Sequence, residues 1–196
     1  MMEWINAADV RILFWLHRLA GPQMNVFITL LTTCINTPWL WLGLAAVGLW
    51  KRRSRWPPDR LVTLRFSKPL RLTISSIVAI ILAVFVGDVA IKHLVMRIRP
   101  YLVIPDAPTL AALKYPVSYS FPSGHSFFFF AGATVFARFN KRLGLMAYVF
   151  AAVVAFSRMY LFMHYPSDVF AGAILGIAVG NVSYVLCQGV KKKLSH

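Results

Sequence analysis

The sequence LTISSIVAIILAVFVGDVAIKHLVM, residues 72–96, decides the fold class of this chain. Its ionisable side chains are Asp88, Lys92 and His93, all close to its carboxyl end. A helix that crosses the hydrocarbon core of a bilayer needs roughly 20 predominantly apolar residues. The stretch therefore predicts a transmembrane helix that carries ionisable side chains near one membrane surface.

Four other segments are similarly apolar, and the overall composition agrees with them. Hydrophobic residues make up 59% of the 196 residues, more than soluble domains of this size usually have. We therefore predict one domain, residues 1–196, with an all-α fold, a polytopic membrane bundle of five to six helices. The further segments are 24–50, with a kink or break expected at Asn36-Thr37-Pro38, 123–136, extendable to 139, 143–163 and 167–187.

Residues 1–21 mix apolar side chains with charged ones, among them Glu3, Asp9, Arg11 and Arg18. We interpret this segment as an amphipathic helix that lies in the membrane interface, and a sixth crossing is the alternative. The charges also interrupt any hydrophobic signal-peptide core, so we expect no cleavable signal.

The net charge of +15 comes from 21 Lys and Arg against 6 Asp and Glu. The basic residues gather in 51–71, 138–142 and 191–193, between the apolar segments, where the positive-inside rule makes these sites cytoplasmic and attracted to anionic lipids. A charge arranged in this way does not indicate nucleic-acid binding. The loop 98–121 and the turn at 164–167 then lie on the extracytoplasmic side, and without a eukaryotic targeting signal we expect a bacterial inner membrane.

Three short polar motifs fall at the extracytoplasmic ends of the predicted helices. They are Lys92-x6-Arg99-Pro100, Pro122-Ser123-Gly124-His125 and Ser157-Arg158-x5-His164-x3-Asp168. Ionisable side chains within membrane segments are costly and usually functional. Their convergence on one face therefore predicts an active site there.

Five residues of these motifs suit a bound phosphate. Arg99 and Arg158 offer planar forks that match phosphate oxygens, and Lys92 offers a point charge. Ser123 and Gly124 open a helix whose free backbone N–H groups favour an anion. Each has a simpler interpretation alone: a lipid anchor for Arg99, an ion pair with Asp88 for Lys92, a helix N-cap for Ser123.

The two histidines of the motifs suit catalysis on that phosphate. A neutral imidazole at His164 can attack phosphorus if its other ring nitrogen has an orienting partner, and Asp168 follows four residues later. His125 is placed to protonate the leaving oxygen. The cations already neutralise a phosphate, so we expect no metal and no other cofactor. Cys34 and Cys187 have no metal-ligand spacing and form no disulfide framework.

These motifs resemble those of the type 2 phosphatidic acid phosphatase superfamily, membrane lipid phosphatases that share active-site motifs with vanadium haloperoxidases. All three family motifs match without departure across residues 92–168. The resemblance implies a metal-independent phosphatase with a phosphohistidine intermediate and usually six crossings. His164 would be the nucleophile, Asp168 its orienting partner and His125 the general acid, while phosphate would be bound by Lys92, Arg99, Ser123, Gly124 and Arg158.

The substrate class implied by the resemblance is a membrane lipid phosphate or diphosphate. Undecaprenyl diphosphate, phosphatidylglycerophosphate, phosphatidate and lipid A phosphate are the bacterial candidates, and we favour the first or a glycerophospholipid monophosphate. Two alternatives stay open beside hydrolysis: a lipid phosphotransferase that uses the same intermediate, and a non-catalytic lipid transporter. The sequence leaves the oligomeric state open.

Overall fold

The computed structural model describes residues 2–18, 21–35, 68–105, 107–110 and 113–194. All regular secondary structure in these ranges is helical, which confirms the all-α prediction. The kink expected at 36–38 and most of the basic loop 51–71 fall outside the described residues. The helices are α1 (Met2–Arg18), α2 (Pro22–Ile35), α4 (Lys68–Ala83), the π-helix η2 (Val84–Ile91), α5 (Lys92–Val95), α6 (Pro100–Val103), α7 (Gly124–Phe139), α8 (Lys141–Tyr160) and α9 (Pro166–Leu194).

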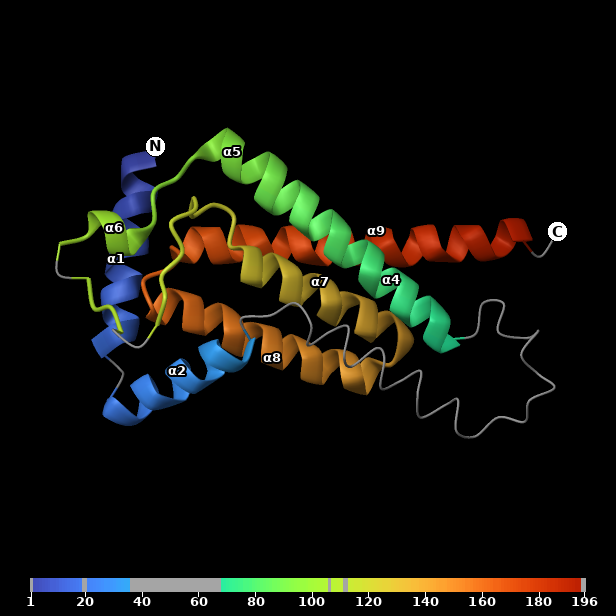
Figure 1. Ribbon diagram of the computed structural model, residues 1–196, viewed down its shortest axis with the longest axis horizontal. Coiled ribbons are helices and arrows are strands. Elements are labelled where there is room, and N and C mark those ends of the chain that lie inside the picture. Colours follow the sequence, from blue (N-terminus) through green and yellow to red (C-terminus); the bar gives the residue numbers. More distant parts are fainter. Residues whose placement is uncertain (1, 19–20, 36–67, 106, 111–112, 195–196) are drawn as a thin grey trace.

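Helix α7 packs against α9, α8 and α4, and these four helices run alongside one another (Figure 1). Among the described residues, three helical stretches are long and apolar enough to cross a membrane: Leu70–Val103, Lys141–Tyr160 and Pro166–Gln188. Side chains such as Phe170 and Ile174 of α9 point away from the bundle, as lipid-facing residues do. The chain is an integral membrane protein, and the number of its crossings stays a prediction.

A row of glycines brings the backbones of α9 and α7 into direct contact. A Cβ atom on any of the three would come within 2.4–2.6 Å of a backbone carbonyl oxygen of α7. The row consists of Gly172, Gly176 and Gly180. Small residues four apart allow such close helix packing in membranes. This contact fixes the first turn of α9 beside the first turn of α7, where the backbone N–H of Ser123 donates to the carbonyl oxygen of Asp168 at 3.0 Å.

Helix α1 lies crosswise at one end of the bundle, where it contacts α8 and α9 (Figure 1). Leu13 and Leu16 are buried, whereas Ile12 and Trp15 are exposed on the outward side. The inward face also holds Asp9, which is only 4% exposed. Whether α1 lies in the membrane interface or forms a sixth crossing stays a prediction.

Candidate active site

The three motifs meet at the end of the bundle that α1 covers. There a cavity of about 500 Å³ opens between η2 and the start of α5, the start of α7 and the end of α8. Six of the eight predicted site residues line it: Lys92, Arg99, Gly124, His125, Arg158 and His164. The remaining two, Ser123 and Asp168, are fully buried and are not among its lining residues.

The lining of this cavity is partly polar and partly apolar. Its polar part consists of the cationic side chains and His164, together with Lys114, Tyr115 and Ser118 of the 98–121 loop. Its apolar part comes from α2, α4, η2 and α7. Its residues are Ile35, Ile80, Val84, Phe128 and Phe129. A charged group and a hydrocarbon chain on the same ligand both find matching surfaces here.

Arg99 is held rigidly in the polar part of the cavity lining. Its chain leaves α5 through Met96, whose left-handed backbone (φ 49°) ends the helix. The guanidinium donates to the carbonyl oxygen of Ser118 at 2.6 Å, to the Ser118 hydroxyl at 2.9 Å and to the carbonyl oxygen of Met163 at 2.9 Å. These bonds fix the plane of the guanidinium, and together with the contact between Nη1 and His164 they use four of its five N–H groups. Arg99 therefore offers an anion in the cavity its positive charge and one N–H of Nη2.

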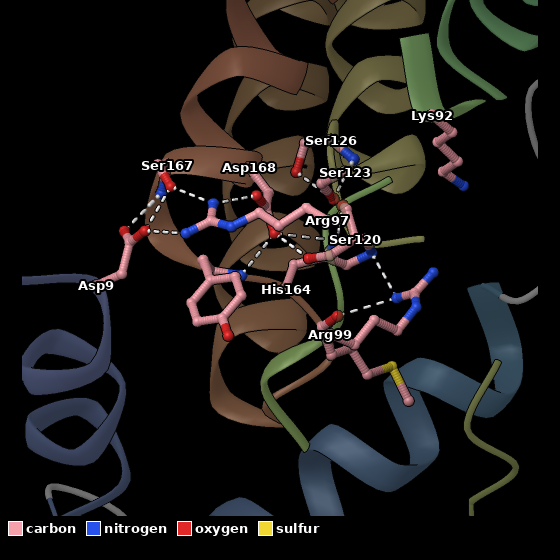
Figure 2. A network of polar contacts seen from close by, with 12 residues as sticks. Asp9, Lys92, Arg97, Arg99, Ser120, Ser123, Ser126, His164, Ser167 and Asp168 are labelled. Carbon is pink, nitrogen blue, oxygen red and sulfur yellow. Dashed lines mark hydrogen bonds and ion pairs between the residues drawn. The ribbon is translucent and has the colours of Figure 1, made fainter. Parts of the chain in front are cut away.

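His164 is oriented by contacts on both ring nitrogens (Figure 2). Nδ1 lies 2.7 Å from the carbonyl oxygen of Ser120, which only accepts, so Nδ1 carries the proton. Nε2 lies 3.1 Å from Nη1 of Arg99, which only donates. Burial lowers the pKa of His164 to about 4, against the effect of the Asp168 carboxylate. The imidazole is therefore neutral near pH 7, with an unprotonated Nε2.

Asp168 contacts His164 less directly than the sequence suggested. The closest carboxylate oxygen lies 3.8 Å from Nδ1, too far for a hydrogen bond. The carboxylate instead accepts from the Ser120 hydroxyl, from the backbone N–H of Tyr165 at 2.9 Å and from Arg97 at 2.5 Å. The carboxylate thus holds the side chain of Ser120, and the carbonyl group of Ser120 holds the imidazole.

Arg158 reaches the cavity from the last turn of α8 and is 1% exposed. Its guanidinium donates to the hydroxyl of Thr32 at 3.0 Å and to the hydroxyl of Ser157 at 3.2 Å. Thr32 lies on α2, so a segment outside the three motifs also positions a site residue.

The first turn of α7 places Ser123 at the N-terminus of the helix and brings Gly124 and His125 to the cavity. Ser123 is the N-cap, and its hydroxyl accepts from the backbone N–H of Ser126 at 3.4 Å and from its hydroxyl at 3.1 Å. A Cβ atom on Gly124 would lie 3.2 Å from the Asp88 carboxylate, so glycine keeps this wall open. His125 lines the cavity, and its ring stacks on Phe129 with centroids 6.4 Å apart.

Lys92 forms the ion pair with Asp88 that its spacing had suggested as an alternative. Both residues line the cavity, and Lys92 lies apart from the hydrogen-bonded network around His164 (Figure 2). The π-helix η2 precedes Lys92, and π-helical turns often occur at functional sites. In this structure the ammonium group of Lys92, which we predict to bind phosphate, is therefore paired with the carboxylate of Asp88.

Sequence reasoning missed several residues that hold this site together. They are Asp9, Thr32, Arg97, Ser118 and Ser120. Arg97 is one of the six unspecified positions between Lys92 and Arg99, so no motif distinguished it from its neighbours. Asp9 had one usable signal, because it lies four and seven residues before the buried Leu13 and Leu16 and so on the same helix face. Within the described residues, no group of three or more His, Cys, Asp or Glu side chains is arranged to hold a metal ion.

Known proteins with similar sequences include phosphatases of lipids. An undecaprenyl-diphosphatase of Sulfolobus acidocaldarius is 30% identical over 133 residues, which cover 67% of this chain and 63% of that protein. A lipid A 4'-phosphatase of Bacteroides thetaiotaomicron is 26% identical in an alignment of 209 positions, gaps included, which covers 99% of this chain and 83% of that protein. This chain thus spans slightly less than two thirds of the length of the archaeal relative.

A solved structure and a family model agree with these relatives. The crystal structure of Aquifex aeolicus LpxE has the same fold, with a TM-score of 0.71, 22% identity and coverage of 89% of this chain and 93% of that one. The model described as the PAP2 superfamily matches residues 72–192, which include all three motifs. The chain therefore belongs to the PAP2 superfamily.

Proposed function

We propose that this chain is a membrane lipid phosphatase that works through a phosphohistidine at His164. One observation carries the proposal: the unprotonated Nε2 of His164 lies beside Arg99 in a cavity that also holds Lys92, Arg158 and His125. Phosphoryl transfer of this kind uses a nucleophile, an acid and cations that surround the phosphate, and this cavity has all of them. The similarity to an undecaprenyl-diphosphatase and to a lipid A 4'-phosphatase supports the same class of reaction.

In the first step, the incoming phosphate takes over the N–H of Arg99 that Nε2 of His164 accepts in the structure. The freed Nε2 attacks phosphorus, and the bond breaks between phosphorus and the leaving oxygen, which belongs to the lipid in a monophosphate and to the remaining phosphate in a diphosphate. The leaving oxygen takes a proton from His125, whose imidazolium form is stabilised by the negative charge of the bound phosphate against burial and the neighbouring cations. Arg99, Arg158 and Lys92 neutralise the charge on the equatorial oxygens, with Lys92 released from Asp88 by the incoming phosphate. The N–H groups at Gly124 and the first turn of α7 add to this stabilisation.

In the second step, water attacks the phosphohistidine and gives its proton to His125, now neutral. The bond between phosphorus and Nε2 breaks, and phosphate leaves. His164 keeps its Nδ1 proton throughout, bound to the Ser120 carbonyl group, so it enters and leaves the cycle as the same tautomer.

The proposed substrate is a lipid with a terminal phosphate or diphosphate. The apolar part of the cavity lining suits a hydrocarbon chain, and the cationic part suits the headgroup. We favour undecaprenyl diphosphate or a glycerophospholipid monophosphate among the candidates. The charge asymmetry of the loops supports an extracytoplasmic site in a bacterial inner membrane.

The test is phosphate release by the purified protein in detergent, with EDTA, over a panel of lipid phosphates and diphosphates. We expect turnover that survives the chelator, is abolished by His164→Ala and is kept by the matched control His93→Ala. His93 is exposed, contacts the carbonyl oxygen of Val89 one turn earlier and meets the ring of Tyr119 edge-on. Wild-type protein that is folded but releases no phosphate from any lipid would contradict hydrolysis. Transfer of labelled phosphate to a second lipid would then favour the phosphotransferase.

Orientation has a separate test. Val117 in the 98–121 loop is 93% exposed, so a Val117→Cys variant with Cys34 and Cys187 replaced offers one accessible thiol. We expect a membrane-impermeant maleimide to label it from the extracytoplasmic side of intact spheroplasts. Labelling only after lysis would place the site on the cytoplasmic side.

A further inference from the structure

A buried ion-pair chain connects helix α1 to the carboxylate beside the nucleophile (Figure 2). Asp9 of α1 accepts from Arg97 at 2.7 Å, from the Ser167 hydroxyl at 2.6 Å and from the Ser167 backbone N–H at 3.0 Å. This N–H belongs to the first turn of α9, where a carboxylate is favourable. Asp9 therefore ties α1 to the start of α9.

Arg97 lies between two carboxylates. One nitrogen of its guanidinium binds Asp9, and the other binds Asp168 at 2.5 Å and the Ser167 hydroxyl at 2.7 Å. The guanidinium also lies over the ring of Tyr165, 3.9 Å from its centroid. Since Asp168 is 0% exposed, its charge needs a partner, and Arg97 supplies it.

Neither Asp9 nor Arg97 lines the cavity, so neither contacts a substrate there. Their connection to the chemistry runs through other residues. Arg97 holds Asp168, Asp168 holds the hydroxyl of Ser120, and the carbonyl group of Ser120 holds Nδ1 of His164. Each contact fixes the position of the next, so a loosened Arg97 displaces the imidazole.

We propose that Asp9 and Arg97 are a pair of positioning residues, and that α1 is therefore a part of the active site as well as a surface helix. The inference rests on the proposed nucleophile, His164. Asp9 binds one end of the Arg97 guanidinium and thereby keeps the other end oriented toward Asp168. A helix that lies crosswise at the end of the bundle thus controls the geometry of the nucleophile.

Two variants test the pair directly. Asp9→Asn keeps the shape of the side chain but removes its charge, and Arg97→Gln removes the guanidinium. We expect each to lower kcat about 10- to 100-fold with KM within about two-fold of wild type, since geometry changes and substrate contacts do not. Arg97→Lys, which keeps the charge, recovers part of the loss. The double variant Asp9→Asn/Arg97→Gln is no slower than Arg97→Gln, since both changes act through one contact.

The matched control is Arg11→Gln, on the same helix. Arg11 is exposed, and its side chain bonds within the helix, to the carbonyl oxygen of Ala7. We expect wild-type kcat and KM for it. Wild-type kcat in Asp9→Asn, or additive losses in the double variant, would overturn the proposal. So would a loss of kcat that only follows the fraction of unfolded protein, read from the apparent melting temperature.

A spectroscopic readout separates this inference from the proposed activity. Nitrogen NMR of protein labelled at its five histidines reports which ring nitrogen of His164 carries the proton, with assignment by the spectrum of His164→Ala. We expect one tautomer, protonated at Nδ1, in the wild type, and a mixture in Asp9→Asn. An unchanged tautomer would overturn the positioning role even if no lipid were hydrolysed. Inactivity of the wild type with a shifted tautomer in the variant would contradict only the proposed function.

Discussion

His164 donates its Nδ1 proton to the backbone carbonyl oxygen of Ser120 over 2.7 Å. A carbonyl group does not titrate, so this contact fixes the tautomer of His164 wherever the imidazole is neutral. A carboxylate at the same position would stabilise a charged imidazolium more strongly. The distance of 3.8 Å to Asp168 leaves that stabilisation partial.

Removal of the Ser120 hydroxyl tests whether Asp168 acts through this residue. Ser120→Ala keeps the carbonyl group that binds His164 but loses the bond to the carboxylate. We expect kcat to fall about 10-fold, which corresponds to a loss of about 1.4 kcal/mol, within the range for one hydrogen bond. The measurement is kcat in the phosphate-release assay.

The matched control is Ser183→Ala, another buried serine, whose hydroxyl bonds within α9 to Val179. It lies on the order of 20 Å along the helix from Asp168. We expect unchanged kcat there. Equal rates for Ser120→Ala and wild type would show that Asp168 affects His164 by another route.

The lowered pKa of His164 predicts a pH-dependent stability. An exposed histidine in the unfolded chain has a pKa of about 6.5, and burial lowers it to about 4 in the fold. Between these values the unfolded chain binds more protons, so the free energy of unfolding falls as the pH falls. We expect the apparent melting temperature in detergent to drop from about pH 7 to about pH 5.

A His164→Asn variant lacks this titration, and its melting temperature changes less over the same interval. The exposed His93→Asn serves as control and keeps the pH dependence of the wild type. If wild type and His164→Asn have the same slope, other groups cause the acid sensitivity.

Periodic and compositional features of the sequence predicted most of the helices. The helices α4 to α5, α7, α8 and α9 fall on the segments predicted at 72–96, 123–139, 143–163 and 167–187. The length of each apolar segment predicts its helix, because a helix must be about 20 apolar residues long to cross a bilayer. Their ends differ where other forces act: α8 begins at Lys141, since Asn140 caps it by accepting from Arg142 and Leu143.

The supporting contacts of the site could not be predicted in the same way. Asp9 and Arg97 are 88 residues apart, and no spacing rule connects residues at that distance. The sequence predicted which side chains gather at one end of the bundle, because successive membrane helices alternate in direction and each motif lies at a helix end. Whether Asp168 binds His164 directly or through Ser120 depends on the path of the 98–121 loop, which has no regular period.

The ion pair between Asp88 and Lys92 predicts a competition with phosphate. Asp88 places a negative charge in the cavity and holds the ammonium group that would otherwise bind the substrate. Asp88→Asn removes both effects, so we expect KM to fall about three- to ten-fold, while Lys92→Gln raises it. The measurement is KM for one lipid phosphate, with inhibition by inorganic phosphate as a second readout. A higher KM in Asp88→Asn would mean that Asp88 aims Lys92 at the substrate.

The contact between α7 and α9 predicts that Gly176 is intolerant of any side chain. A Cβ atom there would lie 2.4 Å from the carbonyl oxygen of Phe127, so Gly176→Ala forces the two helices apart. Overpacking of this kind costs about 1–3 kcal/mol. The two helices carry His125 and Asp168 at their first turns, so the same change also lowers kcat.

Gly21→Ala is the matched control, because nothing lies within 4 Å of a Cβ atom at Gly21. We expect a lower apparent melting temperature and lower kcat for Gly176→Ala and neither for Gly21→Ala; a wild-type melting temperature in Gly176→Ala would contradict direct backbone contact between α7 and α9.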